Sequence, residues 1–95
     1  MSGIGIVLTA HVKDPVKWEK GFRSHSDLLK RGPMTTLIHY TITKNSDVVM
    51  YSETDSVDEY MKFLQSPAIV QAMKEDGVER ETLKVYALDK EFKAS

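Results

Sequence analysis

The most constraining feature of this sequence is the order in which strand-like and helix-like segments alternate along 95 residues. Residues 4–12, 35–43, 48–54 and 82–89 are rich in apolar, β-branched and aromatic side chains, which predicts four strands. Residues 15–31 carry apolar side chains at helical spacing, and a second helical pattern runs from residue 57 up to Gly77. The sequence therefore predicts the order strand, helix, strand, strand, helix, strand.

Punctuating residues support these boundaries. Asp14-Pro15 is typical of a helix start, because Asp caps free amides and Pro fits the first helical position. Gly32-Pro33 predicts that this helix ends at Arg31. Ser56 and Glu59 have the spacing of a capping box. Ser66-Pro67 then repeats the start signal, so we expect the second helix to be kinked or broken there.

This order is the ferredoxin-like βαββαβ plan of the α+β class, here as a single domain over residues 1–95. It predicts a four-stranded antiparallel sheet with the helices on one face. The even-numbered strand residues are the more apolar, so we expect them to face the helices, although a one-residue slip of the hairpin would exchange the faces. The odd-numbered face is too apolar to stand bare, which predicts a homodimer formed through the sheets. Its expected interface residues are Val7, Thr9, His11, His39, Val49 and Tyr51.

The other face predicts a pocket between sheet and helices. Trp18, Phe22 and His25 fall on one side of the first helix, because steps of four and three residues return to nearly the same direction. The full expected lining is Trp18, Phe22, His25, Ile6, Leu8, Tyr40, Met50, Tyr60 and Leu64. His25 and Tyr60 are the candidate catalytic residues, as groups that move protons. The alternative is that the aromatic residues simply pack in the core and that His25 interacts with the helix dipole.

Composition narrows the function further. Thirteen basic and 14 acidic residues give a net charge of -1, which disfavours a nucleic-acid partner. The absence of cysteine excludes thiolate chemistry and Cys-ligated metals, and it fits a cytoplasmic protein. No apolar run is long enough to predict a membrane span. His11 and His39 lack a third ligand, so no metal is expected. Lys74, Glu75 and Asp76 are interpreted as solvated charges at a helix end.

Four segments resemble the dimeric α+β barrel superfamily, and the resemblance covers nearly the whole chain. They are Val12-Lys13-Asp14, the Trp18…Phe22…His25 stripe, the run from Leu64 to Ala68, and Ala72-Met73…Gly77-Val78 before the last strand. The resemblance implies ferredoxin-like subunits that pair through their sheets. The superfamily includes antibiotic-biosynthesis-type monooxygenases, haem-degrading enzymes, polyketide cyclases and small members without known activity.

Individual subgroups of that superfamily differ at their chemical positions. Plant-type polyketide cyclases carry two histidines where this chain has Ser66 and Ile69. Cofactor-free monooxygenases of this fold use an Asn/Trp pair, of which Trp18 resembles the Trp. Haem-degrading members use a helical His with a Trp, so His25 and Trp18 leave haem open, although no cofactor is expected.

Together these features predict a small homodimer that binds an apolar small molecule, such as an aromatic, polyketide-like or long-chain acyl compound. A cofactor-independent enzyme acting on that molecule is one version of this prediction. The alternative is a non-catalytic structural or regulatory dimer module without a ligand.

Overall fold

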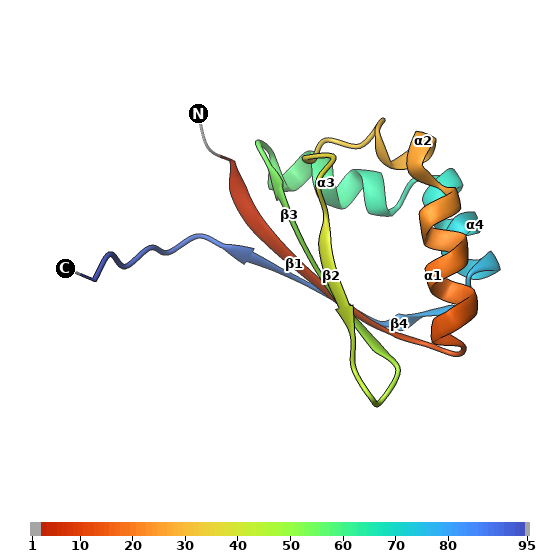
Figure 1. Ribbon diagram of the computed structural model, residues 1–95. Helices are drawn as coiled ribbons and strands as arrows, with labels where there is room; N and C mark the ends of the chain where they lie inside the picture. Colours follow the sequence, from red (N-terminus) through yellow and green to blue (C-terminus); the bar gives the residue numbers. More distant parts are fainter. Residues whose placement is uncertain (1–2, 95) are drawn as a thin grey trace.

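The computed structural model describes residues 3–94. Its elements follow the predicted order, with each long helical segment divided in two: β1 (Ile4–Val12), α1 (Pro15–Ser24), α2 (Ser26–Leu29), β2 (His39–Ile42), β3 (Asp47–Thr54), α3 (Val57–Leu64), α4 (Pro67–Glu75) and β4 (Val78–Leu88). The strands form one antiparallel sheet in the order β2-β3-β1-β4, and the helices lie on one side of it (Figure 1). The expected ferredoxin-like α+β fold is confirmed.

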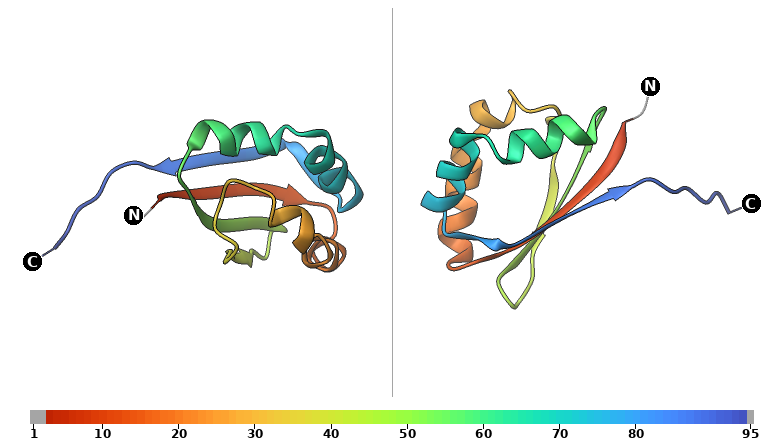
Figure 2. Two further views of the ribbon diagram at one scale, coloured as in Figure 1. Left: turned by 90° about the horizontal axis from the view of Figure 1, so that it is seen from above. Right: turned by 180° about the vertical axis from the view of Figure 1, so that it is seen from behind.

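The helices form two pairs above the sheet. Seen from above, α3 and α4 lie along the β4 edge, whereas α1 lies toward the β3 side (Figure 2). Two groups of buried residues fill the layer between helices and sheet, one around Leu8 and Tyr60 and the other around Trp18 and Val48. Met50 packs against both groups, so the core is continuous along the sheet.

The register of the sheet places even-numbered residues under the helices, as expected. Met50 pairs with Leu8 on one side and with Tyr40 on the other, which aligns all three strands on one face. Along β1 the even residues from Ile6 to Val12 are buried and the odd residues between them are half-buried. The opposite side of the sheet, here called the open face, carries Val7, Thr9, His11, His39, Val49, Tyr51, Tyr86 and Leu88.

The first helix does not run unbroken to Arg31, as its spacing predicted, but ends at Ser24 and resumes at Ser26. The cause is local competition for one carbonyl. The Ser24 hydroxyl donates to the Gly21 carbonyl, and the His25 ring nitrogen Nδ1 contacts the same oxygen. Side-chain bonds of this kind replace helical hydrogen bonds and end the helix. His25 therefore stands at a corner between two helices.

The second break lies where the sequence predicted it. Leu64 ends α3, Ser66 occupies the N-cap position of α4, and Pro67 is its first residue. The Ser66 side chain does not cap α4, because its hydroxyl donates back to the Phe63 carbonyl. The capping box is half formed, since the Glu59 amide donates to the Ser56 hydroxyl while the Glu59 carboxylate contacts Lys62 instead.

Two strands differ in length from the prediction. β2 is shorter than residues 35–43, because the chain after Pro33 meets β3 only locally, through an isolated bridge between Met34 and Thr54 and hydrogen bonds between Thr35 and Glu53. β4 is longer and begins at Val78, not at residue 82. Gly77 adopts a positive φ of 78°, which lets the chain turn from α4 directly into the strand.

The extra length of β4 contains an irregularity. Thr9 pairs with Lys84 but His11 pairs with Glu79, so residues 80–83 stand opposite Ala10 alone. Thr82 stabilises this bulge, because its hydroxyl accepts from the His11 amide at 2.8 Å and donates to the Glu79 carbonyl at 2.6 Å.

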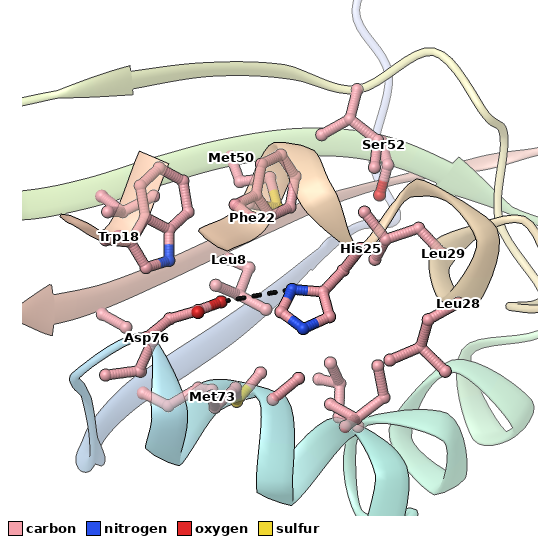
Figure 3. Close-up of a pocket in the computed structure, with 18 of the residues that line it drawn as sticks. Leu8, Trp18, Phe22, His25, Leu28, Leu29, Met50, Ser52, Met73 and Asp76 are labelled. Atoms are coloured by element: carbon pink, nitrogen blue, oxygen red, sulfur yellow. Dashed lines mark ion pairs between the residues drawn. The ribbon is translucent and has the colours of Figure 1, made fainter. Parts of the chain in front are cut away.

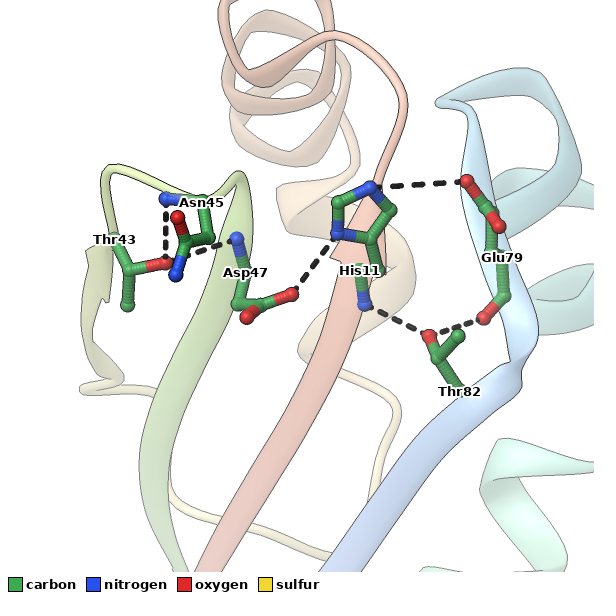
Figure 4. Close-up of polar contacts among 6 residues, drawn as sticks. All are labelled: His11, Thr43, Asn45, Asp47, Glu79 and Thr82. Atoms are coloured by element: carbon green, nitrogen blue, oxygen red, sulfur yellow. Dashed lines mark hydrogen bonds and ion pairs between the residues drawn. The ribbon is translucent and has the colours of Figure 1, made fainter.

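The His11 ring joins three strands at this irregularity (Figure 4). Its Nδ1 lies 3.0 Å from the Asp47 carboxylate on β3, and its Nε2 lies 3.9 Å from the Glu79 carboxylate on β4. Elsewhere on β3, the Tyr51 hydroxyl donates to the Glu53 carboxylate at 3.1 Å. His11 is thus a polar cross-link within one chain.

The chain leaves the body of the molecule after Leu88, and residues 89–94 extend away from it (Figure 1). Phe92 in this segment is 91% exposed. None of the helices formed by residues 3–94 has the length and apolar character needed to cross a membrane.

Candidate functional site

A cavity of about 80 Å³ lies between the sheet and the helices. This exceeds the roughly 10–15 Å³ that one water molecule needs. β1 and β3 form its floor, and all four helices contribute to its walls (Figure 3). Of the nine residues that the sequence proposed as ligand-binding, seven line this cavity: Leu8, Trp18, Phe22, His25, Met50, Tyr60 and Leu64.

The other two proposed residues do not reach the cavity. Ile6 is fully buried and belongs to the packed core. Tyr40 stands edge-on to Trp18 and Phe22, with ring centroids 5.6 and 5.5 Å apart. Its hydroxyl donates to the Glu19 carboxylate on the outer side of α1, and this bond raises the pKa of Tyr40. Tyr40 therefore supports the aromatic wall from behind.

The cavity wall is mainly apolar. Trp18 and Phe22 stack with centroids 4.9 Å apart and planes 14° from parallel, which makes one flat aromatic side. Met50 and Met73 contribute flexible thioether side chains to the wall. The polar lining residues are His25, Ser52, Tyr60 and Asp76.

His25 presents one ring nitrogen to the protein and one to the cavity. Nδ1 bonds to the Gly21 carbonyl and lies 3.5 Å from the nearer Asp76 oxygen. Because a carbonyl only accepts hydrogen bonds, Nδ1 carries a hydrogen, and Nε2 of the neutral ring is then an acceptor. Nε2 is turned away from Asp76, into the space between the helices (Figure 3).

Asp76 is the residue that sequence reasoning missed. It was interpreted as a solvated charge, but it is only 9% exposed and lies against His25. Burial raises the pKa of Asp76, and the His25 ring partly offsets this effect. No local pattern distinguishes Asp76 from Glu75, because its burial depends on Gly21, which comes from a different helix.

Gly21 makes the approach of Asp76 possible. A Cβ atom at residue 21 would overlap the Asp76 carboxylate. The same glycine supplies the carbonyl that contacts the His25 ring. Gly21, His25 and Asp76 therefore form one unit, in which α1 and the end of α4 meet at the cavity wall.

Tyr60, the second catalytic candidate, is 2% exposed. Burial raises the pKa of the Tyr60 hydroxyl, while a hydrogen bond with Ser52 acts in the opposite direction. Tyr60 consequently remains protonated at neutral pH. It can donate a hydrogen bond to a ligand but is not a base.

The geometry also bears on metals and cofactors. Within residues 3–94 there is no group of three His, Asp or Glu side chains arranged to hold a metal ion. Haem, which the resemblance left open through His25 and Trp18, does not fit, because a cavity of about 80 Å³ is too small for a porphyrin ring.

The residues proposed for a dimer interface all lie on the open face. Val7, Thr9, Val49 and Tyr51 form a half-buried apolar strip across β1 and β3. Tyr86 and Leu88, which were not proposed, extend this strip onto β4 and are 50% and 49% exposed. Their alternation along the last strand was the signal that would have found them.

Solved structures with this fold match nearly the whole chain. A Bordetella bronchiseptica protein, assigned provisionally to the antibiotic biosynthesis monooxygenases, has a TM-score of 0.73 and 18% identity, covering 97% of this chain and 100% of that one. The cofactor-independent oxygenase SnoaB from Streptomyces nogalater has a TM-score of 0.69 and 13% identity, covering 98% and 97%. A dimeric ferredoxin-like protein from an uncultured marine organism has a TM-score of 0.57 and 16% identity, covering 100% and 95%.

These matches confirm the expected fold resemblance to antibiotic-biosynthesis-monooxygenase-like proteins. No protein-family model matches the sequence, and no curated protein matches it either. Since the identities are low, the likeness concerns the fold, and function has to be argued from the site.

Proposed function

We propose that this protein binds a mostly apolar small molecule in the cavity between its sheet and its helices. The observation that carries the proposal is the His25–Asp76 pair in a mainly apolar wall. In a wall that served packing alone, a buried imidazole and carboxylate would be unfavourable, because burying such groups costs free energy. An apolar cavity with a few polar groups that converge on it is the usual form of a ligand site.

The lining favours flat or flexible ligands. The stacked Trp18 and Phe22 rings suit an aromatic or polyketide-like compound, and the methionines suit a long-chain acyl group. Because the cavity of about 80 Å³ is smaller than these compounds, binding requires the flexible side chains of Met50 and Met73 to move aside. In the catalytic version of the proposal, Nε2 of His25 accepts a proton from the bound compound and Tyr60 donates a hydrogen bond to it. This version uses neither metal nor cofactor, and the fold neighbour SnoaB is described as a cofactor-independent oxygenase.

We further propose that the protein works as a homodimer paired through the open face. The exposed Tyr86 and Leu88 beside Val7 and Tyr51 leave an apolar strip that a second copy would cover. A neighbour with the same fold is described as a dimeric ferredoxin-like protein, which supports the formation of a dimer.

The binding proposal is tested by NMR with ¹³C-labelled methionine methyl groups and 2-naphthol as the probe. Met50 and Met73 line the cavity, whereas Met61 packs in the same core outside it and serves as an internal control. We expect saturable shifts of the Met50 and Met73 signals with little change at Met61. Native mass spectrometry of the purified protein would identify any compound that stays bound through purification.

The alternative is a dimer module without a ligand, which the apolar open face favours on its own. If 2-naphthol leaves all the methyl signals unchanged and no compound is found by mass spectrometry, this alternative replaces the binding proposal.

A further inference from the structure

We propose that the Asp76 carboxylate determines which ligands the cavity accepts. It favours uncharged aromatic compounds that present a hydroxyl group, and it disfavours carboxylates of the same size. This inference rests on the binding function proposed above and names the ligand class of the same cavity.

The first argument is the charge inventory of the wall. Among the described lining residues, His25 is the sole basic group and Asp76 the sole carboxylate. While Asp76 is ionised, the two charges cancel when His25 is protonated, and a negative charge remains when His25 is neutral. Neither state offers a surplus positive charge to a ligand. An anion that enters an apolar cavity without a counter-charge is strongly disfavoured.

Other basic groups near the cavity do not change this inventory. Arg80 is not part of the lining, and its Nη1 contacts the Leu64 carbonyl and the Met73 sulfur. Lys17 acts on Asp76 through its charge alone, and it is exposed. The exposed Glu75 acts on Asp76 in the opposite direction.

The second argument is that the Asp76 carboxylate is held in place. Its side chain is 12% exposed and packs against the bare Cα of Gly21, which holds the carboxylate at the cavity wall. Nδ1 of His25 is used by the Gly21 carbonyl and Asp76. The remaining Nε2 of the neutral ring accepts a hydrogen bond, which a hydroxyl group can donate and a carboxylate cannot.

The experiment compares 2-naphthol with 2-naphthoate, which share one ring system and differ in charge near neutral pH. Binding is followed through the Met50 and Met73 methyl signals in the wild-type protein, in Asp76→Asn and in Glu75→Gln. The last variant is a matched control, since it removes the same charge one residue away on an exposed side chain that contacts Gln71.

We expect the wild-type protein to bind 2-naphthol at least about tenfold more tightly than 2-naphthoate, because a buried charge without a partner costs at least that much. Asp76→Asn removes the negative charge beside the cavity, so affinity for 2-naphthoate should rise about tenfold. Affinity for 2-naphthol should change little. Glu75→Gln should behave as the wild type does.

The outcomes separate the two proposals. If both compounds bind the wild type equally, or if Asp76→Asn leaves their ratio unchanged, the inference about Asp76 is wrong and the binding function stands. If neither compound binds, both proposals fail. Should Asp76→Asn not fold, Asp76→Ala replaces it, and the wild-type ratio is a test that needs no variant.

Discussion

At the scale of single residues, the cavity wall depends on a side chain that is absent. Gly21 leaves room for the Asp76 carboxylate, and its carbonyl fixes the tautomer of His25. A glycine inside a helix ordinarily costs about 0.5–1 kcal/mol relative to alanine. In this chain the glycine lies at the position of α1 that contacts the end of α4, where a larger residue would overlap Asp76.

Gly21→Ala should therefore destabilise the protein, although the same change in an open helix would stabilise it. We expect a loss of about 1–3 kcal/mol in the free energy of unfolding, which is typical of an overpacked site. Urea denaturation measures it. In the Asp76→Ala background, Gly21→Ala should cost much less than it does in the wild-type protein, because the overlapping carboxylate is gone. Additive effects of the two changes would contradict this account.

Asp76 also predicts how stability depends on pH. The pKa of Asp76 in the folded chain is raised above the ordinary value of 3.8, which applies to the unfolded chain. At a pH between the ordinary and the raised pKa, the folded chain therefore binds more protons than the unfolded chain. Stability from this group is therefore full at low pH and is lost as pH rises through the raised pKa. Protonated His25 moderates the loss.

The measurement is urea unfolding of wild type and Asp76→Asn from about pH 4 to about pH 7. Relative to the variant, the wild type should lose stability as pH rises through this range. The two proteins share their other titrating groups, so the difference isolates Asp76. Parallel pH profiles would show that Asp76 is not desolvated in the folded protein.

Sequence patterns predicted the cavity residues that follow from periodicity. Leu8, Met50, Trp18 and His25 face one another because strand alternation and helix spacing fix their directions. Asp76 escaped prediction, since its environment is created by a glycine on another helix. Tyr40 was misplaced for a related reason: its position was on the correct face, but its hydroxyl reaches outward to Glu19.

At the scale of elements, two helix breaks shape the site, and they differ in cause. The break at Pro67 follows from the backbone chemistry of proline, which lacks an amide hydrogen and fits the first helical position. The break at His25 comes from side-chain bonds to the Gly21 carbonyl, which no spacing rule reveals. The sequence consequently predicted the break at Pro67 and not the break at His25.

Pro67→Ala should change the free energy of unfolding by less than about 1 kcal/mol, because the proline lies at the start of α4 and relieves no strain when removed. Ser56→Ala is the comparison variant, since it removes a hydroxyl that caps α3 and should cost about 1 kcal/mol. Both are measured by urea denaturation. A large stabilisation by Pro67→Ala would mean that the two helices form one strained unit in solution.

At the scale of the whole molecule, the open face predicts association. A homodimer paired through this face should bury a total area at or above about 1,600 Å². Val49→Asp and Tyr51→Glu should convert the dimer to monomers, because each places a charge within the apolar strip. Analytical ultracentrifugation at micromolar concentration measures this. Val16→Asp is a control, as Val16 is 76% exposed on α1, away from the open face.

A wild-type chain that sediments as a monomer at that concentration would contradict the dimer prediction.

The faces of the strands could be predicted from the sequence of one chain alone, since alternation along β1 and β3 determines them. The polar cross-link at His11 was not foreseen, because it depends on the bulge opposite Ala10.

The sheet is a single layer whose neighbouring residues face two different environments: Leu8 reaches the cavity, and Thr9, next in the chain, lies on the open face. In the predicted dimer, the same strand therefore touches ligand and partner at once. Thermodynamic reciprocity then applies to the pair of equilibria. A compound that binds each cavity more tightly in the dimer than in the monomer by some factor must strengthen association by that same factor for every molecule bound, so the subunit dissociation constant becomes a readout of cavity occupancy.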